Sequence, residues 1–285
     1  MMKIGVSGAS GKLGGAVVNY LLEQSNEHRI VAISRSPEKI KREGVEARFG
    51  DYNQPSSLSK AYSGLDRLLL IPSTDMEIGR RAQQNITAID EAVAAGVSHI
   101  VLMSSAGARN VEKTNIAAEY FAGEQHLMKK ANQWSILRMS YYAEAIIDEA
   151  KMSLARGVLT GITENKVSFV SRDDLAAAAA GLLAGVGHDG AIYTGTGPES
   201  LTGAERAEAI AKATGKPFKY VTLPTETLQE QLQQAELPEG VINAVVGIQQ
   251  NFSNGDFDIV TGDIEKLSGR PARSFESILS TTTFQ

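Results

Sequence analysis

Short apolar runs alternate along the first half of the chain with longer segments whose apolar positions recur at helical spacing. Uninterrupted runs are typical of strands that are covered on both faces of a parallel sheet. They occupy residues 30–33, 67–71, 98–103 and 134–137, and a further strand is expected at 3–7. Helices are predicted at 16–22, 37–43, 55–63 and 77–95. Strands and helices that alternate at this interval form right-handed βαβ units. The pattern therefore predicts an α/β fold with a doubly wound parallel sheet.

The second half of the chain predicts a smaller α/β lobe. A helix over 199–215, capped after Thr202, precedes a strand at 218–223 and helices at 226–235 and 238–250. The segment 251–257, which contains Asn, Gly and Asp, is expected to be a mobile loop. We expect one domain over residues 1–155 and a smaller, substrate-side lobe over 156–285, from which some segments return to the first domain.

Composition narrows the class of protein. The chain has 285 residues, of which 42% are hydrophobic and 21% charged, as in an ordinary globular protein. A net charge of -5 without any basic tract argues against a nucleic-acid partner. The chain has no cysteine and only four isolated histidines, so no metal site is expected. No apolar segment is long enough to cross a bilayer, so we expect a cytoplasmic protein without a membrane partner.

A glycine-rich turn lies between the first strand and the first helix. Its residues are Gly8, Ala9, Ser10, Gly11, Lys12, Leu13 and Gly14. Glycine lets the chain bend sharply and approach a pyrophosphate closely, and the N–H groups at a helix start face the phosphates. The spacing is GxxGxxG, a variant of the dinucleotide fingerprint. This turn therefore predicts a Rossmann-type domain that binds a dinucleotide.

The end of the second strand indicates which dinucleotide is bound. NAD-specific sites usually place Asp or Glu there to hold the ribose 2′-hydroxyl, whereas an arginine accommodates a 2′-phosphate. This chain has Arg35, and no carboxylate occurs between Glu27 and Glu38. Lys12 is expected to add a second positive charge to the same phosphate. The sequence thus predicts NADP, with NADPH preferred over NADH.

Other cofactor neighbours follow from the topology. In doubly wound sheets the ligand crosses the carboxyl ends of the strands. That rule nominates three further groups of residues. They are Asp51 and Tyr52, the stretch Ile71, Pro72, Ser73 and Thr74, and the stretch Met103, Ser104, Ser105 and Ala106.

Several landmarks occur in a fixed order along the chain. They are the glycine turn, residues 30–35, 50–55, 68–71, 95–100 and 136–139, residues 170–174 with an alanine-rich helix after them, and residues 263–271. Together they resemble the NmrA-like atypical short-chain dehydrogenases, most closely the bacterial NADPH:quinone oxidoreductases and triphenylmethane reductases. The resemblance runs essentially from end to end. It implies a quinone-like small molecule as substrate.

The resemblance also implies which residues form the site. In similar enzymes the segment after the strand at 134–137 contacts the nicotinamide half of the cofactor, which implies Arg138, Met139 and Ser140. The chain departs from the pattern at two positions. Met139 stands where those reductases often have Asn, and Gln125 stands where they often have Lys.

Three further residues are candidates for substrate contact. Tyr141 and Tyr142 are expected either to line a flat apolar pocket or to pack at the interface of the two domains. Arg172 is expected to brace the wall of that pocket. The neighbouring Asp173 and Asp174 are also explained by the preference of helix N-termini for carboxylates.

The chain lacks the Tyr-x-x-x-Lys pair of catalytic short-chain dehydrogenases. None of its eight tyrosines is followed four positions later by lysine, and Tyr120, nearest the usual place, is followed by Glu124. In those enzymes the tyrosine delivers a proton and the lysine lowers its pKa. A sugar epimerase, dehydratase or alcohol dehydrogenase needs this pair. A quinone does not, because its reduced form takes protons from water.

Two classes of function therefore remain open. The first is an NADPH-dependent reductase of quinones or similar planar acceptors. The second is a non-catalytic NADP sensor that regulates a partner, as some NmrA-like proteins do. A sugar-nucleotide enzyme would require a tyrosine–lysine pair assembled from distant positions.

Overall fold

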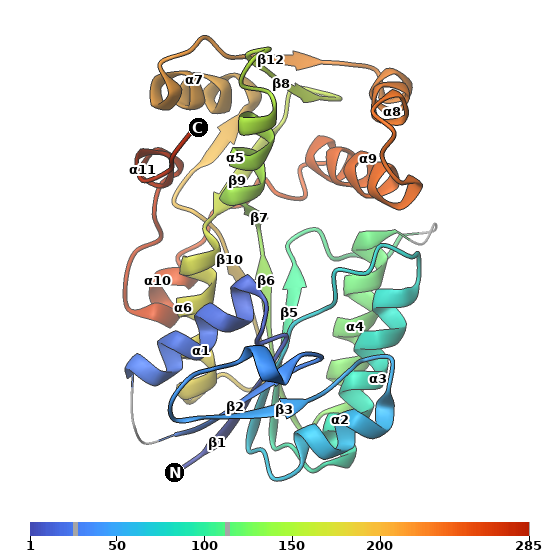
Figure 1. Cartoon of the computed structure of the whole chain (residues 1–285), viewed down its shortest axis with the longest axis vertical. Coiled ribbons are helices and arrows are strands. Elements are labelled where there is room, and N and C mark those ends of the chain that lie inside the picture. The colour runs from blue at the N-terminus through green and yellow to red at the C-terminus, as the bar shows by residue number, and fades with distance from the viewer. Residues whose placement is uncertain (25–27, 112–114, 285) are drawn as a thin grey trace.

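A seven-stranded parallel sheet forms the centre of the larger part of the molecule (Figure 1). The computed structural model describes residues 1–24, 28–111 and 115–284. In sheet order the strands are β10 (Ala191–Gly195), β6 (Gln133–Met139), β5 (His99–Ser105), β4 (Arg67–Leu70), β1 (Lys3–Ser7), β2 (Arg29–Ser34) and β3 (Val45–Phe49). The chain runs outward from β1 to β3 and then returns to β4 on the other side of β1. The strand order therefore reverses between β1 and β4, where doubly wound sheets bind ligands.

Helices cover both faces of this sheet (Figure 1). One face carries α1 (Lys12–Gln24), α6 (Arg172–Ala184) and α10 (Asp263–Ser268), and the other carries α2 (Pro55–Tyr62), α3 (Arg80–Ala94) and α4 (Ile116–Lys130). Within β2, Ile30 and Ala32 pack in the first core, whereas Val31 and Ile33 pack in the second. Both faces of the strand are buried, which explains why its apolar run is uninterrupted.

A smaller lobe lies above the carboxyl ends of the strands. It contains a three-stranded sheet of β11 (Ser200–Thr202), β9 (Lys166–Val170) and β7 (Tyr141–Tyr142), and the pair β12 (Lys219–Thr222) and β8 (Val158–Gly161). Its helices are α5 (Ala143–Met152), α7 (Gly203–Thr214), α8 (Thr225–Gln234), α9 (Glu239–Ser253) and α11 (Phe275–Ser280). Phe169, Phe252, Phe257 and Phe275 are buried in the core of this lobe.

The chain passes between the two parts repeatedly. Beyond residue 155, α6, β10 and α10 pack in or on the large sheet, whereas the other elements there build the smaller lobe. The division at residue 155 stays a prediction, with α6, β10 and α10 as its returning segments.

Several boundaries differ from those expected. The edge strand β3 lies at Val45–Phe49, where no element was predicted. The helix expected from 37 is the short 3-10 helix η1 (Pro37–Lys39), and α3 begins at Arg80 rather than at residue 77. Residues 199–215 contain β11 before α7, which begins at a capping box between Thr202 and Glu205. No described helix is both long enough and apolar enough to pass through a membrane.

The loop expected at 251–257 is shorter than predicted, because α9 extends to Ser253 and a turn follows at 254–257. Asn251 and Phe252 belong to α9 and are buried, and Phe257 is buried as well. Phe252 and Phe257 pack edge to face with ring centroids 5.4 Å apart. Asparagine, glycine and aspartate at this place turn the chain beneath an aromatic core.

Candidate active site

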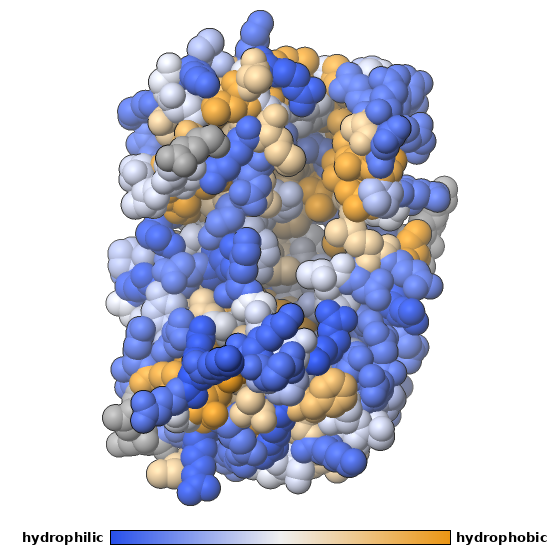
Figure 2. Space-filling model, viewed as in Figure 1, coloured by the Kyte–Doolittle hydropathy of each residue, from blue (hydrophilic) through white to orange (hydrophobic). Residues whose placement is uncertain are grey.

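A cavity of about 550 Å³ extends along the carboxyl ends of six strands of the large sheet. Met139 of β6, Met103 of β5 and Ile71 after β4 line one part of it. Ser7 of β1 and the ends of β2 and β3 line the rest. Figure 2 shows the surface hollowed between α5 and α9, with hydrophobic residues gathered on the α9 side. The cavity thus lies at the crossover of the sheet, beneath the smaller lobe.

The glycine turn forms one wall of the cavity. Gly8 has a φ of +64°, which favours glycine. A Cβ added at Gly14 would lie 2.5 Å from the carbonyl oxygen of Gly8, so glycine is required there for the turn to pack on α1. Lys12 and Leu13, the first residues of α1, line the cavity. The unpaired N–H groups of this helix start therefore face a space suited to a pyrophosphate.

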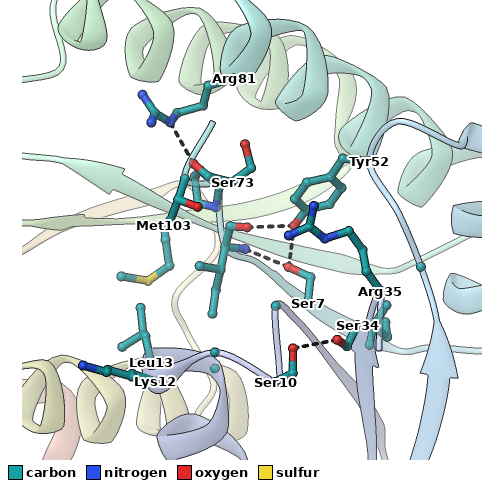
Figure 3. A pocket seen from close by; sticks show the side chains of 18 of the residues that line it. Ser7, Ser10, Lys12, Leu13, Ser34, Arg35, Tyr52, Ser73, Arg81 and Met103 are labelled. Carbon is teal, nitrogen blue, oxygen red and sulfur yellow. Dashed lines mark hydrogen bonds between the residues drawn. The ribbon is translucent and has the colours of Figure 1, made fainter. Parts of the chain in front are cut away.

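The end beyond β2 is positively charged. Arg35 is exposed at the cavity edge, and no described carboxylate lies within 4 Å of it. The carboxylate of Asp51, which also lines the cavity, accepts hydrogen bonds from the Asn53 N–H at 3.0 Å and the Gln54 amide at 3.2 Å. Ser10 and Ser34 hydroxyls bond at 2.7 Å and tie the glycine turn to β2 (Figure 3).

Lys12 does not converge with Arg35. In Figure 3 its side chain extends away from Arg35, on the side of Leu13 and Met103. The expectation that both cations serve one phosphate is therefore not met by this arrangement. Arg35 remains the cation at the β2 end.

A ring of hydrogen bonds fixes the middle of the cavity. The Ser7 and Tyr52 hydroxyls lie 2.6 Å apart, Tyr52 donates to the Ile71 carbonyl at 2.8 Å, and the Ile71 N–H donates to Ser7 Oγ at 2.8 Å (Figure 3). Burial raises the pKa of Tyr52 to about 12. Because its hydroxyl is engaged, Tyr52 offers a ligand its ring rather than its oxygen.

Aromatic and apolar side chains gather at the β6 end. Tyr120 and Tyr142 line the cavity beside Met103 and Met139, and the Arg172 guanidinium lies 5.1 Å from the centre of the Tyr142 ring. Burial raises the pKa of Tyr120 and of Tyr142, so both phenols are protonated at neutral pH. Arg81, which donates to the Ser73 carbonyl at 3.0 Å and pairs with the buried Glu119, closes this end (Figure 3).

Glu124 of α4 is fully buried on the face of the sheet that α4 covers. Its carboxylate accepts from Arg138 Nε at 2.8 Å and Nη2 at 2.6 Å, and from the Ser104 hydroxyl at 2.5 Å. The bond to Glu124 raises the pKa of Arg138. The residue four positions after Tyr120 therefore anchors α4 to β5 and β6 and brings no cation to the cavity.

Most of the predicted site residues come together. Those lining the cavity are Gly8, Ser10, Gly11, Lys12, Leu13, Gly14, Arg35, Asp51, Tyr52, Ile71, Pro72, Ser73, Thr74, Met103, Met139, Tyr142 and Arg172. Seven others are not among the lining residues, namely Ala9, Ser104, Ser105, Ala106, Arg138, Ser140 and Tyr141.

Packing explains most of these seven placements. Ser104 and Arg138 bind Glu124, and Ala9 is buried in the core. Ser140 bonds to Ser168, with their hydroxyls 2.8 Å apart. Tyr141 packs edge to face on Phe252, with ring centroids 4.9 Å apart, in the core of the smaller lobe.

Several lining residues escaped the sequence analysis. They are Ser7, Ile33, Ser34, Gly50, Leu58, Met76, Arg81 and Tyr120. The rule on strand ends could have found Ser7, Ile33, Ser34 and Gly50, which lie at or beside strand ends. Leu58, Met76 and Arg81 reach the cavity from helices or a loop, and no local pattern indicates them. The sequence indicates Tyr120 only as the tyrosine nearest the usual catalytic place, and not as a site residue.

Comparisons with known proteins agree with this geometry. Residues 8–185 match a protein family described as NAD(P)H-binding. Quinone oxidoreductase 2 of Escherichia coli is 30% identical over 281 residues, 97% of each chain. The crystal structure of that NADPH-dependent quinone oxidoreductase complexed with NADPH superimposes with a TM-score of 0.89, covering 97% of this chain and 98% of that one.

Two further relatives are similar over nearly their whole length. NAD(P)H azoreductase of Xenophilus azovorans is 26% identical, covering 95% of this chain and 94% of the relative. Triphenylmethane reductase of Citrobacter sp., solved as a complex with NADP(H), is 29% identical with a TM-score of 0.88, covering 96% of this chain and 98% of that one.

Proposed function

Because this chain belongs to the NAD(P)H-binding, NmrA-like family and is an NAD(P)H-dependent oxidoreductase, we propose that it uses NADPH to reduce quinones or similar planar, electron-poor acceptors. Relatives named for quinones, azo compounds and triphenylmethanes support an acceptor of this kind. The cavity supports it too, because Met103, Met139, Tyr120 and Tyr142 form an apolar, aromatic space at its β6 end.

The residues of the cavity fit NADPH. The cofactor supplies the hydride when it is bound. The glycine turn and the start of α1 would hold its pyrophosphate, and Arg35 would hold the 2′-phosphate. Lys12 adds positive charge beside the turn. Asp51 and Tyr52 would border the adenine end, and Met103 and Met139 the nicotinamide end.

The main support for the proposal is the position of Glu124. Tyr120 lines the cavity, but the residue four positions later is a buried carboxylate engaged by Arg138 and Ser104. Lys12 is the one lysine among the described lining residues, and it belongs to the glycine turn. An acceptor whose reduced form takes its protons from water needs no Tyr-x-x-x-Lys pair, so the chain's contribution is to bind the acceptor and orient it against the cofactor.

Absorbance at 340 nm with purified protein, NADPH or NADH, and a small panel of quinones tests the proposal. We expect quinone-dependent loss of NADPH well above the free solution reaction, and a slower loss with NADH. Tight NADPH binding without turnover of any acceptor would overturn it and favour an NADP sensor.

A further inference from the structure

The β6 end of the cavity holds hydrogen-bond donors for which the described part of the protein provides no acceptor. Neither the Tyr120 nor the Tyr142 hydroxyl bonds to a described residue, in contrast to the engaged hydroxyl of Tyr52. The side chain of Arg172 likewise donates no hydrogen bond to a described residue. Three donors thus border the same space.

Arg172 differs in this respect from the other partly or fully buried arginines of the described chain. Those arginines all donate side-chain hydrogen bonds, for example Arg81 to Ser73, Arg138 to Glu124 and Arg206 to Asn165. The Arg172 side chain is 24% exposed, and its closest carboxylate, Glu144, lies 4.0 Å from Nη1. A half-buried guanidinium with five free N–H donors is suited to bind an anion bidentately.

Glu144 offsets the charge of Arg172 only in part. Its oxygens accept from the backbone N–H of Arg172 at 3.0 and 3.2 Å, so the carboxylate is held at the N-terminus of α6. Glu144 is also not among the residues that line the cavity, whereas Arg172 and Tyr142 are. Asp51 is the one carboxylate among the described lining residues, and it lies at the far end, beyond β3.

Resting on the proposed function, we propose that Arg172, with the Tyr142 hydroxyl beside it, is a specificity-determining subsite for an anionic group carried by the acceptor. A carboxylate, sulfonate or phosphate on the ring system would accept hydrogen bonds from the free guanidinium donors, with the rings against the nicotinamide that Met103 and Met139 border. A cationic dye would meet the positive charge of Arg172. The enzyme therefore selects anionic over neutral acceptors, and neutral over cationic ones.

Binding of redox-inert probes tests the subsite without turnover. Calorimetry would compare naphthalene-2-sulfonate with its neutral sulfonamide on the NADP⁺-loaded protein. We expect Arg172→Met to weaken sulfonate binding about tenfold or more, the effect of losing charge-assisted hydrogen bonds, and to leave the sulfonamide unchanged. Glu144→Gln should strengthen sulfonate binding. Arg29→Met, which removes an exposed arginine at the opposite end of the sheet, is the matched control and should change neither.

Turnover then relates the subsite to selectivity. The panel is 1,4-naphthoquinone-2-sulfonate, 1,4-naphthoquinone and a triphenylmethane cation, assayed with wild type and Arg172→Met. We expect the differences in kcat/KM between the anionic, neutral and cationic acceptors to be smaller in the variant than in wild type. Equal loss for both probes, an unchanged charge order, or weaker NADPH binding with an unchanged sulfonate-to-sulfonamide ratio would overturn it. If no acceptor is reduced by wild type, the proposed function fails, and the calorimetry still decides on the subsite.

Discussion

At the scale of single residues, the charge of a side chain and the side of the sheet to which it points decide the chemistry of the cavity. Arg35 is exposed at its edge without a described acidic partner, whereas Arg138 is bound to the buried Glu124 on the other side of the sheet. Both arginines lie at carboxyl ends of strands. Only the first has donors free for a phosphate.

Replacing Arg35 tests this difference. Arg35→Asp should weaken NADPH binding about tenfold or more, because it removes charge-assisted hydrogen bonds to the 2′-phosphate and adds repulsion. It should spare or improve NADH binding, since an aspartate can hold a ribose hydroxyl. Calorimetric titration of both nucleotides measures the ratio. Unchanged affinities for both would contradict the assignment of Arg35, and Lys39→Asp on the nearby η1 serves as a control.

At the scale of elements, the turn between β1 and α1 depends on two different properties of glycine. Gly8 adopts a positive φ, while Gly14 leaves room for the carbonyl of Gly8. The second requirement involves packing rather than dihedral angles. It fixes how closely the start of α1 approaches the end of β1.

Gly14→Ala should therefore distort the wall that faces the pyrophosphate. The new Cβ meets three backbone atoms at 2.5 to 3.0 Å, so we expect a loss of about 1–3 kcal/mol of stability. NADPH should also raise the melting temperature of this variant less than that of wild type. Gly247→Ala in α9 is the matched control, because its Cβ would meet nothing within 4 Å, and it should stabilise by about 0.5–1 kcal/mol. Similar behaviour of the two variants would contradict the packing argument.

The elements also show how far sequence reasoning reaches. The apolar runs and the glycine turn predicted the large parallel sheet and the carboxyl ends of its strands as the place where a ligand binds. They did not predict which side chains at the strand ends face the cavity, because successive strand residues point to opposite sides of the sheet. Met103 packs in the core beneath α1 and α6 and lines the cavity, while the next residue, Ser104, faces Glu124 of α4. In the same way, Tyr142 lines the cavity, whereas the neighbouring Tyr141 packs in the core of the smaller lobe. Arg81 and Tyr120 reach the cavity only through the packing of α3 and α4.

At the scale of the whole molecule, the two edges of the large sheet differ in chemistry. The carboxyl edge carries the cavity, and the amino edge carries the buried His99 and the partly buried His188. His99, the first residue of β5, lies 2.8 Å from the Ser135 hydroxyl, which donates to the His188 carbonyl at 2.5 Å. Burial, with Arg67 nearby, lowers the pKa of His99 and of His188.

This edge makes stability depend on pH. In the folded protein the pKa values of His99 and His188 lie below the ordinary 6.5. Between the folded and the unfolded pKa values, the unfolded chain therefore binds more protons than the folded one. The stabilisation is complete above about pH 6.5 and is lost as the pH falls. The free energy of unfolding in urea should decline from pH 7.5 to 5.5, by at most about 1.4 kcal/mol per pH unit for each site. His99→Gln should flatten part of this decline without altering NADPH binding at the opposite edge. Parallel curves for variant and wild type would show that His99 is not responsible.

The repeated passage of the chain between its two parts has a consequence for how such proteins diversify. Asp173 and Asp174 at the start of α6 bind Arg270 and Arg273, so the C-terminal segment is tied to the large sheet on its way to α11. A lobe interlaced in this way cannot be exchanged for another by recombination at a single junction. We therefore expect new acceptors to be reached by point substitutions in the cavity walls, with both halves of the chain kept together.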